Sequence, residues 1–347
     1  MNTDYDYWEY FLRECERAGD VPLYVQLVRG IGKDDELKDM ASRVTPGQPH
    51  ANIILASVHY LLLRGDPHPL RRFYPSLNGG HSLSEDAFPL FKDFVDTHRA
   101  ELTPLIANGV TNTNEVQRCS VLHAGFRAVA KEAGQPLNLI ELGPSAGLNM
   151  IWNKYRVRYM RDGEEFFAGP EEALLSIECT IRGEKTPPLG ATPKIASRAG
   201  LELNPVDLSD PHWRDWLKAL VWPDQVARFA RLEKAIDIRL RETLDIRPGD
   251  ALALLPDALR AVPENEPVCV YHTSVTYQFS RAMREALSDM LTVAGLRRPV
   301  WRLALEADAK GGAWRNWLTR TRYHDGIVER RTLAESHPHG SWLEWLD

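Results

Sequence analysis

Residues 139–150 read LIELGPSAGLNM, and this stretch decides the predicted fold. An apolar run that ends in Glu141 has the composition of a buried strand, and Gly143 and Gly147 enclose the turn that follows. Glycine lets the backbone approach a ligand closely, and the N-terminus of a following helix offers free N–H groups. We therefore expect a strand, a glycine turn and a helix start that together hold a nucleotide-like ligand.

The spacing E-x-G-x-x-x-G differs from the dinucleotide fingerprint G-x-G-x-x-G, because Ser145 stands at the second glycine and crowds a pyrophosphate. The pattern resembles motif I of class I S-adenosylmethionine-dependent methyltransferases. In that family the turn holds the amino-acid end of the cofactor, and the strand-end acid is nearby. The resemblance implies that S-adenosylmethionine is bound by Glu141, Gly143, Ser145, Gly147 and Asn149.

Length and charge are those of a globular protein with one large or two modest domains. The 347 residues include 42 basic and 48 acidic side chains, a net charge of −6. The chain therefore has no excess of basic residues that would indicate nucleic acid or an anionic membrane as a partner. A small uncharged or cationic substrate fits better. The four cysteines are far apart, and residues 1–10 do not resemble a signal peptide, so we expect a reducing, cytoplasmic location.

The first third of the chain is helical in its periodicity. Apolar residues recur three and four positions apart in the segments 8–15, 53–63, 88–105 and 116–129. The most apolar of these, 53–63, is too short to cross a bilayer. We predict a helical N-terminal cap domain over 1–110 and an α/β domain over 111–347, with an insertion at about 153–198.

The last helix of that series leads directly into the glycine strand. Asn114 and Arg118 are therefore expected near the turn, where they would bind the carboxylate of the cofactor. The alternative is that Asn114 and Glu115 belong to a capping box and that the charges are solvated.

Four later apolar stretches predict further strands of the same sheet. In a doubly wound sheet the acid at the end of the second strand reaches the ribose hydroxyls, so Glu202 is the expected ribose ligand. Asp250 and Ala251 follow the third strand and extend the cofactor site. The pair Asp325–Gly326 joins two strand-like segments as a hairpin. The predicted fold is a Rossmann-like, class I methyltransferase-type doubly wound α/β sheet with a C-terminal antiparallel hairpin.

The catalytic candidates follow the fourth predicted strand. His272 ends that strand, and histidine takes or gives a proton near neutral pH. Tyr277, five residues on, is expected to orient the methyl acceptor. The alternative is that His272 only hydrogen-bonds a backbone carbonyl beneath the cofactor.

The whole chain resembles an uncharacterised family, domain of unknown function 2332. This resemblance implies a methyltransferase-like fold and no established reaction. The chain departs from the family pattern at Asn112, Asn153 and Glu202, where Gln, Asp and Asp are usual. The segments that carry the resemblance are 113–116, 141–149 with Tyr155, 200–207, 221–223, 249–251, 272–273 and 337–340.

Two other functions fit the same residues. The turn 143–147 also matches the G-x-S-x-G nucleophile elbow of serine hydrolases, with Glu306 followed by His324 or His337 in the required order. Three other acids, Glu141, Glu202 and Asp250, each end a strand as adenosyl binding requires. They favour the adenosyl cofactor, because a hydrolase needs none of the three. A non-catalytic protein that binds an adenosyl ligand is the second alternative.

His337 and His339 resemble metal ligands, but the last strand delivers them to the edge of the sheet opposite the cofactor, so we expect no metal site. The expected function is an S-adenosylmethionine-dependent small-molecule methyltransferase.

Overall fold

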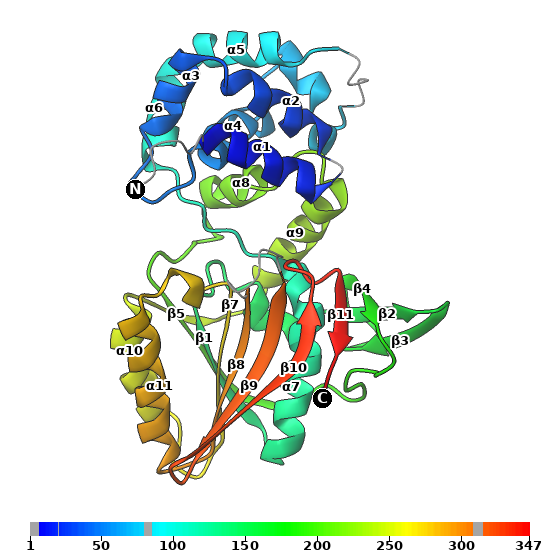
Figure 1. The fold of residues 1–347 in the computed structure, drawn as a ribbon, viewed down its shortest axis with the longest axis vertical. Coiled ribbons are helices and arrows are strands. Elements are labelled where there is room, and N and C mark those ends of the chain that lie inside the picture. The colour runs from blue at the N-terminus through cyan, green and yellow to red at the C-terminus, as the bar shows by residue number, and fades with distance from the viewer. Residues whose placement is uncertain (1–6, 20, 80–84, 308–314) are drawn as a thin grey trace. The chain divides into compact units, whose positions relative to one another are not determined.

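The computed structural model describes residues 7–19, 21–79, 85–307 and 315–347 (Figure 1). The chain divides into two compact units, of which the first comprises residues 1–113 and 208–233 and the second comprises 114–207 and 234–347. The first unit is thus built from two separate segments of the chain, and the predicted boundary at 110 leaves the second segment out. None of the described helices is both long and apolar enough to cross a membrane.

The first unit contains helices and no strand among its described residues. At its centre is α4 (His50–Leu63), in which ten of the 14 residues are buried because its sequence has no polar stripe. His59 in this helix is fully buried, with its ring nitrogens bonded to the Ala219 carbonyl and the Ser76 hydroxyl. The other elements are α1 (Tyr7–Ala18), α2 (Pro22–Ile31), α3 (Asp35–Ser42), the 3-10 helices η1 (Pro69–Phe73) and η2 (Pro75–Leu77), α5 (Phe88–Thr97), α6 (Arg99–Asn108) and α8 (Pro211–Ala219).

The predicted helix over 88–105 is two helices, α5 and α6. The residue between them, His98, has φ −105° and ψ 21°. Its ring stacks on Phe94 with 4.1 Å between centroids and bonds the Phe94 carbonyl, which ends α5 there. Helix α9 (Val226–Arg239) includes both residue 233, the last of the first unit, and residue 234, where the second unit resumes.

The second unit is built on an 11-stranded mixed sheet with the order β3-β2-β4-β11-β10-β9-β8-β7-β1-β5-β6. Five neighbouring strands, β6-β5-β1-β7-β8, run parallel. Numbered among themselves by their order in the chain, these five strands follow one another along the sheet as 3-2-1-4-5. The direction of this order reverses between β1 and β7. Their bounds are β1 (Leu137–Leu142), β5 (Ile195–Glu202), β6 (Asp245–Pro248), β7 (Val268–Thr273) and β8 (Val300–Ala307).

Two antiparallel strands, β9 (Asn316–His324) and β10 (Ile327–Ser336), continue the sheet beyond β8. Between them Asp325 and Gly326 have φ values of 50° and 76°. Both positive values are what a two-residue type I′ turn requires, and the predicted hairpin is confirmed.

The segment predicted as an insertion forms one edge of the sheet. It contains β2 (Arg156–Arg161), β3 (Glu164–Ala168) and β4 (Ser176–Arg182), and β4 pairs in parallel with the C-terminal β11 (Trp342–Trp345). Side chains of β4 alternate between buried and exposed, as in a strand with one face in the core.

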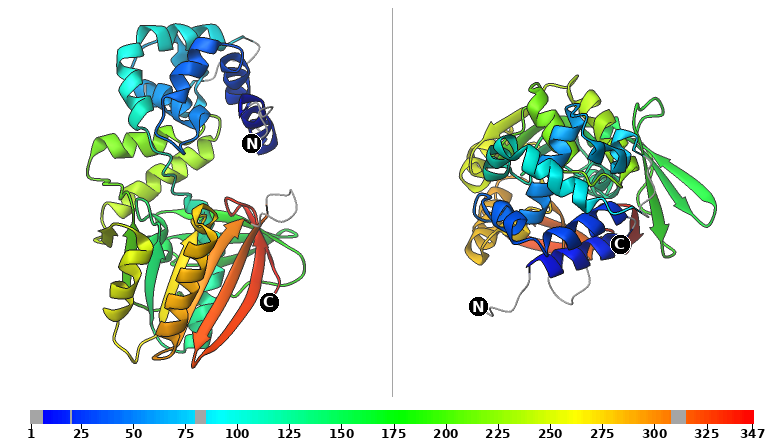
Figure 2. Two further views of the ribbon diagram at one scale, coloured as in Figure 1. Left: turned by 60° about the vertical axis from the view of Figure 1, so that its left-hand side comes forward. Right: turned by 90° about the horizontal axis from the view of Figure 1, so that it is seen from above.

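Helices cover both faces of the sheet (Figures 1 and 2). On one face α10 (Ala251–Arg260) and α11 (Arg281–Gly295) pack on a core that includes Tyr323 of β9. Leu318, an odd number of positions earlier on the same strand, points to the other face, where α7 (Cys119–Ala133) lies. A Cβ on Gly125 of α7 would be 2.9 Å from Leu303 and 3.1 Å from Leu318, so this glycine permits close packing.

Candidate functional site

The carboxyl ends of the five parallel strands meet at one edge of the sheet, and most of the predicted site residues lie there. At the end of β1, Gly143 and Gly147 have φ values of +67° and +76°. Ser145 has φ +54°, a conformation that is strained for a residue with a side chain. The N–H of Gly143 donates to the Leu201 carbonyl at 2.9 Å, and that of Gly147 donates to the Pro144 carbonyl at 2.8 Å. One of these bonds ties the turn to β5, and the other closes the turn on itself.

The expected α-helix after the turn is absent. The turn leads instead into η4 (Asn149–Lys154), a six-residue 3-10 helix in which Ile151 departs from helical geometry, and then into β2. Residues 149–152 are all buried, so their conformation is set by tertiary packing rather than by helical propensity. The site thus lacks the helix N-terminus on which anion binding was expected to rest.

Glu202, at the end of β5, closes the turn. Its Oε2 accepts the Ser145 N–H at 2.7 Å, and its Oε1 accepts the Asn204 N–H at 3.0 Å. A carboxylate thus occupies the N–H group that a phosphate would need. Each oxygen keeps a further lone pair, so the predicted ribose contact is compatible with this geometry.

Glu141 lies in the interior beneath the turn, 1 % exposed. Its Oε2 accepts the hydroxyl hydrogen of Tyr271 at 2.8 Å. Burial raises the pKa of Glu141 from its ordinary value of 4.5 to about 8, although the bond from Tyr271 opposes this rise. Glu141 is therefore mainly neutral at pH 7. Sequence reasoning missed Tyr271, which lies beside Glu141 only because β7 pairs with β1.

Two asparagines brace the turn. The Oδ1 of Asn114 accepts the N–H of Leu148 at 2.8 Å, so Asn114 lies at the turn as the order of the elements indicated. The buried Asn149 has its Oδ1 bonded to the thiol of Cys119 at 3.3 Å. Both side chains hold the turn from within the protein.

The remaining predicted cofactor residues lie on either side of this turn. Arg118 donates through Nε to the carbonyl of Pro338 at 3.0 Å, which ties it to the C-terminal loop. Asp250 caps α10, because its Oδ1 accepts the N–H of Ala253 at 2.9 Å. Ala251 is the first residue of that helix. Asp250 and Ala251 follow β6 and are thus at the same edge of the sheet as the glycine turn.

His272 is fully buried, and both of its ring nitrogens are engaged. Nδ1 lies 2.6 Å from Oε1 of Glu306, and Nε2 lies 2.9 Å from Nε of Arg302. These partners assign a neutral ring that donates from Nδ1 and accepts at Nε2. Burial lowers the pKa of His272, in keeping with that neutral state. No nitrogen is left to take a proton from a substrate, and the partners are side chains rather than the backbone carbonyl of the alternative.

The loop after β7 carries the second catalytic candidate. Tyr277 lies in η5 (Thr276–Gln278) and is 67 % exposed. Sequence reasoning missed Arg302, the Glu306 contacts and Val275 in this region. One sequence signal could have indicated that Arg302 and Glu306 belong to the same site. They are four positions apart on a predicted strand and therefore share a face.

The two histidines of the hydrolase alternative lie at different edges of the sheet. His337, like His339, follows β10, which runs parallel to β8, so both are at the carboxyl edge with Glu306, and the expectation that they lie at the opposite edge is wrong. Glu306 pairs with Trp317 at one end of β8, whereas His324 adjoins the pair of Val300 and Tyr323 at the other end, about 20 Å away along the strand. In the described ranges, no cluster of three or more His, Cys, Asp or Glu side chains is placed to bind a metal ion.

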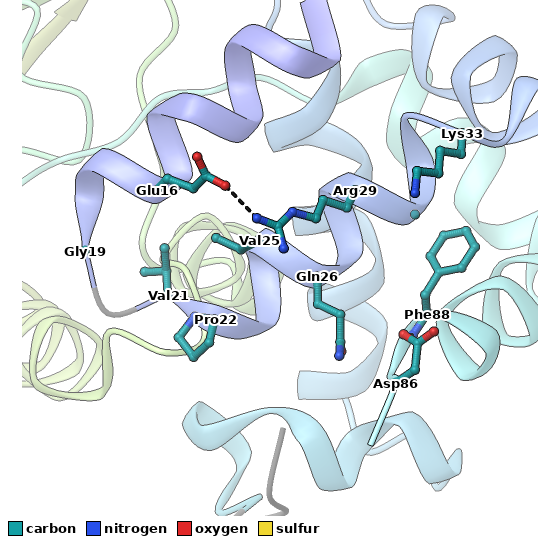
Figure 3. Close-up of a pocket in the computed structure, with 11 residues that line it drawn as sticks. Glu16, Gly19, Val21, Pro22, Val25, Gln26, Arg29, Lys33, Asp86 and Phe88 are labelled. Atoms are coloured by element: carbon teal, nitrogen blue, oxygen red, sulfur yellow. Dashed lines mark hydrogen bonds and ion pairs between the residues drawn. The ribbon is translucent and has the colours of Figure 1, made fainter. Parts of the chain in front are cut away.

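A cavity of about 780 Å³ lies in the first unit (Figure 3). It is an open depression beside α2, and Arg29 on its wall is paired with Glu16 at 2.7 Å. None of the predicted site residues lines it. The lining residues are Glu16, Gly19, Val21, Pro22, Val25, Gln26, Arg29, Gly30, Lys33, Asp86 and Phe88.

Comparison with known proteins confirms the family that the sequence motifs indicated. No curated protein and no solved structure matches the chain. Residues 10–345, nearly the whole chain, match the family described as "Uncharacterized protein conserved in bacteria (DUF2332)", and the protein belongs to that family.

Proposed function

We propose that the second unit binds S-adenosylmethionine and transfers its methyl group to a small molecule. The order of the five parallel strands supports this, because it is the order 3-2-1-4-5 of doubly wound nucleotide-binding sheets. In such sheets ligands bind outside the carboxyl ends, where the strand order reverses. Here that point is between β1, with its glycine turn, and β7. A Rossmann-like, methyltransferase-type fold is part of the proposal.

The observation that carries the proposal is that carboxylates accept the backbone N–H groups of the loops at the strand ends. Glu202 accepts the N–H groups of Ser145 and Asn204, and Glu306 accepts those of Val275 and Thr276. In phosphate sites such loop N–H groups point at the ligand. Carboxylates in their place give the edge negative charge, which disfavours a dinucleotide pyrophosphate. S-adenosylmethionine has no phosphate and carries a sulfonium cation, which suits an acidic edge.

The residues would divide the work as follows. Gly143 and Gly147 supply the positive φ values that shape the turn, and Glu202 binds the ribose hydroxyls. Asp250 and the start of α10 at Ala251 lie at the next strand end, where they would hold the base. The cofactor supplies an activated methyl group. The protein has chiefly to align acceptor and donor, and an acceptor with no proton to lose, such as a tertiary amine or a thioether, needs no general base.

A non-catalytic adenosyl-binding protein is the second candidate. It is favoured by one observation, that both ring nitrogens of His272 are engaged and the expected base is therefore occupied. Methyl transfer measured with a pool of small-molecule acceptors separates the two candidates, since only an enzyme releases S-adenosylhomocysteine.

Thermal unfolding with added ligand tests binding itself. S-adenosylmethionine or S-adenosylhomocysteine should raise the melting temperature and NAD should not, since a ligand that binds only the folded state stabilises it. Asp250→Ser keeps an N-cap for α10 but removes the carboxylate, so it should reduce the ligand shift while the free protein melts as before. The matched control is Glu329→Gln on β10, which is exposed. Absence of a shift with both adenosyl ligands would refute the proposal.

A further inference from the structure

One carboxylate oxygen binds two successive N–H groups of the loop that follows β7, residues 274–278. Oε1 of Glu306 accepts the N–H of Val275 at 2.9 Å, the N–H of Thr276 at 3.2 Å and the Nδ1–H of His272 at 2.6 Å. Its other oxygen, Oε2, is buried without a hydrogen-bond partner in the structure as described. Oε1 accepts two of the loop's N–H groups; the loop is also held by the N–H of Ser274, which donates to the Leu305 carbonyl at 3.0 Å, and by Arg284, which donates to the Thr276 carbonyl at 3.2 Å.

A buried chain of side chains supports this acceptor. Arg302 donates through Nε to Nε2 of His272, whose Nδ1 donates in turn to Glu306. Burial raises the pKa of Glu306, but the bonds from His272, Val275 and Thr276 outweigh it and leave the pKa below 4.5. Glu306 is therefore ionised, and its hydrogen bonds are of the stronger, charge-assisted kind.

The loop occupies the space between the ends of β1 and β7. A Cβ built on Gly143 would lie 2.8 Å from Cγ2 of Val275, so Val275 fills the space beside the glycine turn. Ser274, at the start of the loop, has φ +54°, a strained conformation that persists only where surrounding contacts enforce it. Tyr277 in the same loop is largely exposed.

We propose that Glu306 is a positioning residue that fixes loop 274–278, with Val275 as the wall beside Gly143 and Tyr277 presented to the methyl acceptor. The ligand part of this inference rests on the proposed function. The anchoring of the loop does not, and it is measured without ligand.

The experiment compares Glu306→Ala with Glu306→Gln by site-resolved hydrogen exchange at the amides of Val275 and Thr276. The alanine variant should exchange at least tenfold faster there. The glutamine variant should fall between it and the wild type, because glutamine keeps one oxygen acceptor but loses the charge and replaces the other oxygen by an NH2 group. Exchange in the β9–β10 hairpin should stay unchanged, which separates local release of the loop from a general loss of stability.

Glu132→Gln is the matched control. Glu132 is another partly buried acid that contacts the same strand, since it accepts from the indole of Trp301 at 2.9 Å and pairs with Arg320. It acts on the opposite face of β8, so its replacement should leave exchange at Val275 and Thr276 as in the wild type.

Calorimetric titration with S-adenosylmethionine tests the ligand part. If Glu306→Ala lowers tenfold the fraction of molecules in which loop 274–278 has the conformation described here, the apparent Kd for S-adenosylmethionine should rise by about the same factor. Unchanged exchange at Val275 and Thr276 in both Glu306 variants would overturn the anchoring. Faster exchange with an unaltered Kd would overturn the positioning of the site. Faster exchange in a protein whose wild type does not bind the cofactor would support the anchor and refute the proposed function.

Discussion

Glu141→Gln should stabilise the second unit near neutral pH and remove part of its pH dependence. The folded state holds a proton on Glu141 up to about pH 8, whereas the unfolded chain releases it near 4.5. The contribution of Glu141 to stability is therefore largest below pH 4.5, falls as the pH rises, and levels off above pH 8. With 1.36 kcal/mol for each pKa unit, the loss is about 3 kcal/mol at pH 7 and about 5 kcal/mol above pH 8, both as upper limits.

Glutamine has nearly the same size, cannot ionise and still offers an oxygen to the hydroxyl of Tyr271. The variant should melt up to roughly 6–12 °C above the wild type at pH 7, with a larger gain at pH 9 and a gain of only about 2–3 °C at pH 5. Thermal unfolding at these three pH values, followed by circular dichroism, measures the trend. Glu329→Gln, on the exposed part of β10, is the control for removal of one negative charge. An equal shift at all three pH values, or a variant less stable than wild type at pH 9, would refute a neutral Glu141.

Three further predictions follow from the contacts described above. Gly143→Ala should lower the free energy of unfolding by about 1–3 kcal/mol, because the positive φ and the contact with Val275 leave no room for a Cβ; urea titration checks this, and a smaller change would show that the turn can shift. Arg118→Ala should reduce thermal stability and leave the calorimetric affinity for S-adenosylmethionine unchanged, because Arg118 donates to Pro338; a tenfold weaker affinity would restore its predicted role at the cofactor carboxylate. Gly326→Ala should lower the free energy of unfolding by about 1 kcal/mol in the same urea assay, since φ is +76° in the β9–β10 turn, and an unchanged midpoint would contradict that turn type.

Local sequence was sufficient where a structure depends on neighbours in the chain. The apolar run before Gly143 forms β1, and the Asp325–Gly326 pair forms the hairpin, because each is determined by turn chemistry and side-chain period. The assignment of residues 208–233 to the first unit was not predictable in this way. It depends on contacts such as the bond from Trp216 to the Val110 carbonyl, which join residues more than a hundred positions apart.

The pairing of β4 with β11 was hidden for the same reason. Side chains along β4 alternate between buried and exposed, and such a pattern indicates one buried face but gives no information about the neighbouring strand. Its partner is the last strand of the chain, and a pairing over so long a separation leaves no local signal. The prediction of a helix after Gly147 was wrong for a different reason, since tertiary contacts around residues 149–152 outweigh helical propensity and leave a 3-10 helix.

The strand-end acids illustrate what sequence can tell about a site and what it cannot. Glu141, Glu202 and Glu306 all end parallel strands, and as sequence signals they are equivalent. Their environments differ because each depends on a neighbouring strand. Glu141 meets Tyr271 and is neutral, Glu202 binds the N–H of the glycine turn, and Glu306 binds the loop after β7. An acid at a strand end therefore predicts a place on the carboxyl edge, whereas its charge and its availability to a ligand are set by sheet order and register.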